Sequence, residues 1–156
     1  MKKLVAYFSH SGSTAVLANQ IHEITDSDIF EIVPVNPYPN DYSAVVDRAS
    51  QEQKNDYRPQ IETEIRNMDS YDAVFVGYSN WCGTIPMIIF SLFEKYNFSG
   101  KTIIPFCTHG GGGLGSSVED IKRSCPQSTV LNALAISGSS IKNVKEDVLK
   151  WLDEIG

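Results

Sequence analysis

The chain has 156 residues, of which 42% are hydrophobic and 21% charged, which suits one domain with a sizeable core. Its formal net charge of −6 argues against a nucleic-acid partner, because phosphate backbones attract basic surfaces. No apolar run approaches the ~20 residues that a membrane span needs, and Ser9 ends the N-terminal apolar run too early for a secretory signal peptide.

The cysteines favour a reducing environment. Cys82, Cys107 and Cys125 are spaced 25 and 18 residues apart. This spacing excludes a CxxC redox motif and a zinc knuckle, and an odd, sparse count argues against a disulfide scaffold. We therefore expect a cytoplasmic protein with no metal site.

Five short apolar runs are predicted to be strands. Most are nearly continuous in apolar residues instead of alternating, which is typical of strands buried on both faces of a parallel sheet. In chain order they are residues 4–8, 29–35, 73–78, 102–107 and 130–136.

Apolar residues spaced three or four apart between and after these runs predict helices. We expect Pro86 in the first turn of the second helix and the end of the third before Cys125 and Pro126. The apolar faces are formed by Leu17, Ile21 and Ile24; by Ile85, Ile88, Ile89, Leu92, Phe93 and Tyr96; by Val118 and Ile121; and by Ile141, Val144, Val148, Leu152 and Ile155. The alternation predicts a single α/β domain, a doubly wound parallel sheet with helices on both faces.

One connection is longer than the others. The second and third strands start 44 residues apart, whereas the other steps are 25 to 29 residues. The surplus lies in residues 36–61, where Tyr42, Val45, Val46 and Ala49 indicate a helical part. Two interpretations stay open: a tolerated surface excursion, and a flap or partner surface near the functional site.

Three segments follow strands at the edge of the sheet where α/β proteins bind ligands. The first consists of Ser9, His10, Ser11, Gly12, Ser13 and Thr14. Hydroxyls, backbone N–H groups and a helix N-terminus are typical of an anion cradle, although the hydroxyls could merely cap the helix. Residues 4–47 contain no Lys or Arg, so we expect a monophosphate held by dipoles and hydroxyls, with His10 as the only nearby side chain able to become cationic.

The other two segments favour a planar ligand. The second contains Asn80, Trp81, Cys82 and Gly83, and the third contains Thr108, His109, Gly110, Gly111, Gly112 and Gly113. Trp81 offers a flat surface to a ligand, or it folds into the core. Four consecutive glycines indicate a close backbone approach or positive φ angles, or a merely flexible connector. The three segments together indicate a phosphorylated planar cofactor, and flavin mononucleotide (FMN) fits best.

The sequence resembles the flavodoxin family in three motifs: YFSHSGST at residues 7–14, GYSNWCGTIPM at 77–87 and IPFCTHGG at 104–111. The resemblance implies the sheet order 2-1-3-4-5. It also implies that residues 9–14 bind the FMN phosphate and that residues 80–83 and 108–113 flank the isoalloxazine ring. Cys82 stands where an aromatic residue is usual, either as a redox-active thiol or as a small space-filling substitution.

The resemblance favours a low-potential one-electron carrier between redox proteins. In such a carrier the flavin supplies the redox chemistry, and no side chain is catalytic. The acidic surface would dock on basic partners, and the protein would be a monomer or weak dimer. Two alternatives stay open. One is an NAD(P)H-dependent quinone or nitro-compound reductase of the same fold, and the other is a flavin-free binding module with a second segment altered by Ser79, Asn80 and Cys82.

Overall fold

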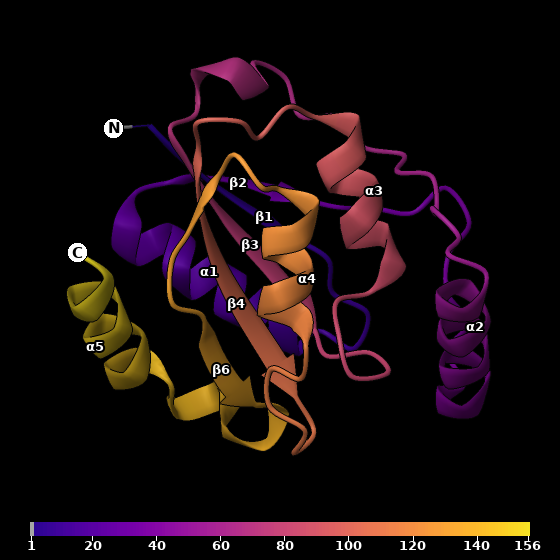
Figure 1. Cartoon of the computed structure of the whole chain (residues 1–156). Coiled ribbons are helices and arrows are strands. Elements are labelled where there is room, and N and C mark those ends of the chain that lie inside the picture. Colours follow the sequence, from indigo (N-terminus) through magenta and orange to yellow (C-terminus); the bar gives the residue numbers. More distant parts are fainter. Residues whose placement is uncertain (1) are drawn as a thin grey trace.

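The structure, a computed structural model, describes residues 2–156, apart from the side chains of residues 142 and 143. Its centre is a parallel sheet in the order β2-β1-β3-β4-β5, with β6 also paired to β4 (Figure 1). The strands are β1 (Lys3–Tyr7), β2 (Asp28–Glu31), β3 (Ala73–Ser79), β4 (Thr102–His109), β5 (Thr129–Val130) and β6 (Leu134–Ser137). The predicted α/β fold with the order 2-1-3-4-5 is confirmed.

Within residues 2–156, five α-helices surround the sheet (Figure 1). They are α1 (Ser13–Thr25), α2 (Tyr42–Lys54), α3 (Met87–Lys95), α4 (Ser117–Ser124) and α5 (Lys145–Ile155). Helices α1 and α5 cover one face of the sheet and α3 and α4 cover the other, while α2 stands at the outer side of α3. None of the helices in the described part of the chain is long and apolar enough to cross a membrane.

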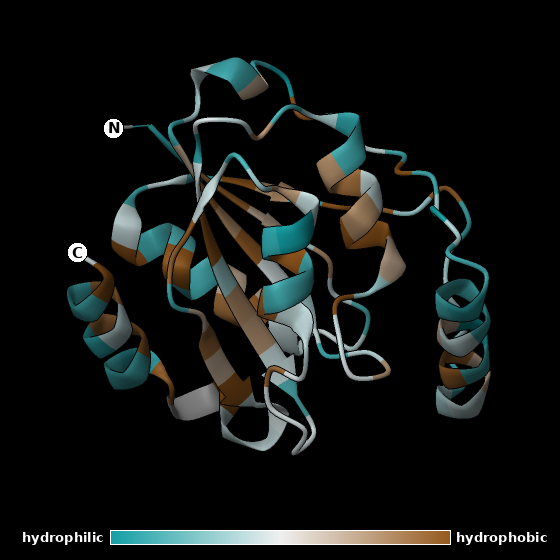
Figure 2. Ribbon diagram, viewed as in Figure 1, coloured by the Kyte–Doolittle hydropathy of each residue, from teal (hydrophilic) through white to brown (hydrophobic). Residues whose placement is uncertain are grey.

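Each face of the sheet has its own core, which explains why the strand sequences are continuously apolar. In β1, Leu4 and Ala6 pack toward α3 and α4, and Val5 and Tyr7 pack toward α1 and α5. Figure 2 shows the hydrophobic strands flanked by helices, of which α2, α4 and α5 carry many hydrophilic residues while α3 is mostly hydrophobic. Successive side chains of a strand point to opposite faces, so a strand covered on both sides needs apolar residues throughout.

Two predicted strands differ in extent from the structure. The run at 130–136 forms two short strands, β5 and β6. The Leu131 N–H still donates to the Ile103 carbonyl of β4 at 2.9 Å, and the break falls at residues 132 and 133, where the Trp151 indole N–H donates to the Asn132 carbonyl at 2.9 Å. The run at 29–35 ends as β2 at Glu31. Proline has no N–H group for a parallel ladder, and Pro34 instead forms an antiparallel bridge with Ile61.

Two predicted helix starts were also wrong. Pro86 is the N-cap of α3, with an extended ψ of 148°, and the first helical residue is Met87. At the C-terminus the apolar spacing begins at Ile141, but residues Gly138–Asn143 form a 3₁₀ helix and α5 begins at Lys145. The acidic Glu146 and Asp147 then occupy the first turn of α5, where they complement the helix dipole.

Candidate functional site

The first loop, residues 9–14, runs from β1 into α1 and is held by Ser9. The Ser9 hydroxyl oxygen accepts hydrogen bonds from the backbone N–H groups of Gly12 at 3.2 Å and Ala15 at 3.1 Å. Gly12, the N-cap, has a φ of 99°, a conformation that glycine adopts without strain. The N–H groups of Ser13 and Thr14 lie in the first helical turn, where no intrahelical acceptor exists. The loop therefore has the geometry of an anion cradle.

Three hydroxyl groups join the loops that follow β1, β3 and β4. Thr14 Oγ1 lies 2.7 Å from Thr108 Oγ1 and 3.1 Å from Ser79 Oγ, and the Ser79 and Thr108 hydroxyls are 2.8 Å apart. Thr14 is 1% exposed and Thr108 2% exposed. Both residues are thus buried, and their hydroxyls are bonded to each other and to Ser79 instead of facing the surface.

The second loop, residues 79–84, is a tight turn. Trp81 and Thr84 exchange two backbone hydrogen bonds at 2.9 and 3.2 Å. Between them Cys82 has a φ of 53° and Gly83 a φ of 86°, the positive pair that a type I′ turn requires. The Asn80 side chain stabilises this turn, because its oxygen accepts from the Gly83 N–H at 3.0 Å. The turn places Cys82 and Gly83 on the exposed surface.

The third loop, residues 108–115, needs its glycines for their backbone conformation. Gly111, Gly113 and Gly115 have positive φ angles of 128°, 64° and 54°, so the prediction of positive φ is confirmed in this run. The His109 ring nitrogen Nδ1 accepts the Gly111 N–H at 3.0 Å, which orients the loop. The Asn80 amide donates to the Gly113 carbonyl at 2.9 Å and joins the second loop to the third.

Trp81 is partly buried among aromatic rings. Its ring centroid lies 4.9 Å from that of Tyr38, 5.3 Å from Phe8 and 6.2 Å from His10, and all three neighbours meet it edge to face. Trp81 also packs against the core on the α3 side. The interpretation that Trp81 folds into the core is therefore confirmed in part, and its role as a flat surface for a ligand stays a prediction.

The insertion, residues 36–61, reaches the same aromatic cluster. Glu52 on α2 accepts a hydrogen bond from the Tyr38 hydroxyl at 2.6 Å and forms an ion pair with Arg48 at 3.1 Å. The Arg48 guanidinium lies 3.8 Å from the centre of the Tyr38 ring. Burial and the bond to Glu52 raise the pKa of Tyr38, so its hydroxyl stays protonated. Arg48 is a cationic group at this aromatic cluster that the sequence did not predict.

The insertion also contacts the second loop directly. The Gln53 side chain on α2 donates to the Cys82 carbonyl at 3.3 Å. Together with the contact between Tyr38 and Trp81, this favours the interpretation that places the insertion near the functional site. Its predicted helical part is confirmed as α2.

Sequence reasoning missed several residues at this edge of the sheet. A Cβ atom at Gly138 would lie 3.7 Å from the Ser13 hydroxyl and 3.8 Å from the His109 carbonyl, so the chain after β6 borders the first and third loops. Its hydroxyl-rich sequence at residues 137–140 follows a predicted strand, as the first loop does, and that signal was available. Tyr38, Arg48 and Ser79 gave no comparable local signal.

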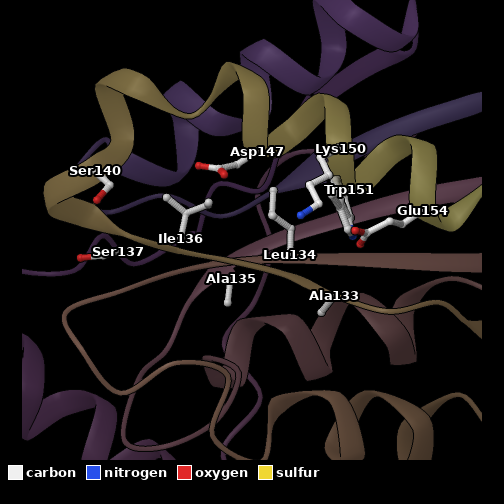
Figure 3. A pocket seen from close by; sticks show the side chains of 10 residues that line it. All are labelled: Ala133, Leu134, Ala135, Ile136, Ser137, Ser140, Asp147, Lys150, Trp151 and Glu154. Atoms are coloured by element: carbon white, nitrogen blue, oxygen red, sulfur yellow. The ribbon is translucent and has the colours of Figure 1, made fainter.

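A separate groove of about 430 Å³ lies between β6 and α5. Figure 3 shows Leu134 and Ile136 pointing toward α5 and Ala135 pointing to the opposite face of the strand. Charged side chains of α5, including Asp147 and Lys150, line the groove. None of its lining residues belongs to the first, second or third loop, although Ser137 and Ser140 belong to the segment 137–140 that borders the first and third loops.

The cysteines are expected to differ sharply in reactivity. Burial raises the pKa of Cys107 to about 12 and that of Cys125 to about 11, whereas Cys82 is exposed. A thiol reagent at pH 8 is therefore expected to modify one thiol of the folded protein quickly, because thiolate and access together set the rate. Cys82→Ser should abolish this fast phase. Rapid labelling of two or three thiols would contradict the burial.

A family model described as flavodoxin matches residues 2–155. The chain belongs to the flavodoxin family. The resemblance seen in the three motifs is thereby confirmed over nearly the whole chain. Among curated proteins no match was found.

Solved structures place this flavodoxin-family chain among flavoproteins. A candidate flavoprotein from Bacteroides eggerthii is 32% identical, covers 99% of this chain and 97% of its own, and superposes with a TM-score of 0.84. A flavoprotein from Lactobacillus acidophilus, crystallised in complex with FMN, is 23% identical over 90% of this chain and 96% of its own, with a TM-score of 0.73. An NADH:FMN oxidoreductase shares the fold at 17% identity, with 99% and 86% coverage and a TM-score of 0.62.

Proposed function

We propose that this protein binds FMN and carries electrons one at a time between redox proteins in the cytoplasm. The observation that carries the proposal is the meeting of three loops at the carboxyl edge of the sheet, joined by the hydroxyls of Thr14, Ser79 and Thr108. Ligands of open α/β sheets bind at this edge. The FMN complex of the Lactobacillus acidophilus flavoprotein supports the choice of cofactor.

The donor groups of the first loop fit a monophosphate. Backbone N–H groups at the start of α1 and exposed Ser11 face this edge, and residues 4–47 contain no Lys or Arg. Such a cradle binds an anion through dipoles and hydroxyls, whereas nucleoside triphosphates are usually bound with Lys and a metal ion. The residues proposed to hold the phosphate are Ser9, His10, Ser11, Gly12, Ser13 and Thr14.

The second and third loops are proposed to flank the ring system. Gly111 and Gly112 are exposed, and Gly12, Gly83 and Gly111 leave open space where a Cβ atom would stand, so a planar ligand can approach the backbone closely. The proposed contacts are Asn80, Trp81, Cys82, Gly83, His109, Gly110, Gly111, Gly112 and Gly113, while Thr108, which is 2% exposed, supports the third loop from inside the protein. Bound FMN supplies reversible electron uptake, and the protein supplies its orientation and surroundings.

Exposure of the second and third loops favours a carrier. Cys82, Gly83 and residues 110–112 all lie on the surface, so the ring edge between them would stay accessible to a partner protein. The net charge of −6 favours partners with basic docking surfaces, and we expect transfer rates to fall as salt screens this attraction.

A two-electron NAD(P)H-dependent reductase is the second candidate. The observation that favours it is the insertion: Tyr38 and Gln53 border the second loop, and an insertion so placed can shape a substrate site. The fold shared with an NADH:FMN oxidoreductase is consistent with this alternative.

Anaerobic potentiometric titration of the FMN-loaded protein distinguishes the two candidates. A carrier is expected to take up electrons in two separate one-electron steps and to show no steady NADH or NADPH oxidation without a partner protein. A single two-electron step, together with sustained NAD(P)H oxidation in the presence of a quinone, would contradict the carrier and favour the reductase.

A further inference from the structure

We propose that Thr108 and Ser79 are positioning residues that set how tightly the first loop binds phosphate. The inference rests on the proposed FMN site and concerns two hydroxyls that need not touch the cofactor. They act through Thr14, whose Oγ1 lies 2.7 Å from the Thr108 hydroxyl and 3.1 Å from the Ser79 hydroxyl.

The three hydroxyls form a closed set. A hydroxyl donates one hydrogen bond and can accept two, so three groups around a triangle with edges of 2.7, 2.8 and 3.1 Å can each donate once and accept once. Buried hydroxyls need such partners, and a fully satisfied network is rigid because each bond polarises the next. The triangle thus holds Thr14 against the carboxyl ends of β3 and β4.

Thr14 is the second residue of α1, so holding its side chain also fixes the first helical turn. That turn carries the N–H groups of Ser13 and Thr14, which lack intrahelical acceptors. On its other side the turn is held by Ser9, whose hydroxyl accepts from Gly12 and Ala15. The first turn is therefore fixed at two points, on either side of the donors that an anion would meet.

Precise placement of these donors matters because the loop itself offers no Lys or Arg. Binding by fixed dipoles depends on donors that are already oriented before the ligand arrives. If Thr108 loses its hydroxyl, Thr14 and Ser79 lose a buried partner and the first turn gains freedom. The phosphate contribution to binding should then fall, while contacts with the flavin ring are retained.

The test compares two ligands that differ only in the phosphate. Dissociation constants for FMN and for riboflavin are measured for the wild-type protein, for Thr108→Val, which keeps the side-chain shape, and for Thr108→Ser, which keeps the hydroxyl. Thr108→Val is expected to weaken FMN binding about tenfold and riboflavin binding less than about twofold, with Thr108→Ser close to wild type. Thr102→Val, at the opposite end of the same strand, is the matched control and should change neither constant.

The outcomes separate this inference from the proposed function. If the wild-type protein binds neither ligand, the proposed FMN function fails. If wild-type protein binds FMN but Thr108→Val weakens both ligands equally, or neither, the positioning role is overturned. Ser79→Ala provides a second variant should Thr108→Val not fold, and it too must weaken FMN more than riboflavin.

Discussion

Replacement of Gly115 by alanine is expected to lower the free energy of unfolding by about 3 kcal/mol, through steric overlap and an unfavourable left-handed conformation. A Cβ atom at this position would lie 2.2 Å from the carbonyl oxygen and 2.8 Å from the carbonyl carbon of Gly83. Both are backbone atoms and cannot rotate away. Gly115 also has a φ of 54°. Urea unfolding followed by circular dichroism measures the effect.

The same substitution should disturb the proposed FMN site, because it separates the second loop from the third. The Ser116 N–H donates to the Gly83 carbonyl at 2.9 Å, and this bond cannot persist if the two backbones move apart. Gly110→Ala is the matched control: it lies in the same loop, has no positive φ and has open space at the Cβ position. Equal losses of stability for both variants would contradict the close approach at Gly115.

Replacement of Glu52 by alanine is expected to lower the free energy of unfolding by about 3 kcal/mol, because the buried Tyr38 hydroxyl and the Arg48 guanidinium both lose their carboxylate partner. Glu52 is 6% exposed, and its carboxylate accepts hydrogen bonds from the Tyr38 hydroxyl and from the Arg48 guanidinium. Its loss should also free Tyr38 from its position against Trp81 and change the near-ultraviolet circular dichroism of the aromatic cluster.

The matched control for Glu52 is Asp47→Ala on the same helix, since Asp47 is exposed and should change stability by less than about 0.5 kcal/mol. Tyr38→Phe removes one hydroxyl and keeps the ring, so it should lower the free energy of unfolding by about 1 kcal/mol. If Glu52→Ala proves as mild as Asp47→Ala, the insertion is not held to the molecule by this network.

The central sheet could be predicted because its physical cause is local. Strands covered on both faces need apolar side chains at every position, and residues 73–78 show that pattern in the sequence itself. The three loops were predictable for a similar reason, since each directly follows a strand whose carboxyl end lies at the binding edge. The positive φ angles of Gly111 and Gly113 follow from glycine's own preferences.

The details that sequence reasoning missed depend on contacts between distant segments. Thr14 is 65 residues from Ser79 and 94 from Thr108, and a lone serine or threonine says nothing about a partner so far away. Arg48 reaches the aromatic cluster only because α2 folds back over Tyr38. The division of the last strand likewise falls where the Trp151 side chain, from a different element, bonds to the Asn132 carbonyl.

FMN binding by the purified protein is the most direct test of the proposed site. Titration of the cofactor-free protein with FMN, followed by flavin fluorescence and by calorimetry, should show one binding site with a dissociation constant below about 1 µM. Riboflavin should bind more weakly, because it lacks the group that the first loop is proposed to hold. Absence of saturable FMN binding by a protein whose circular dichroism shows it to be folded would contradict the account and leave a flavin-free member of the family.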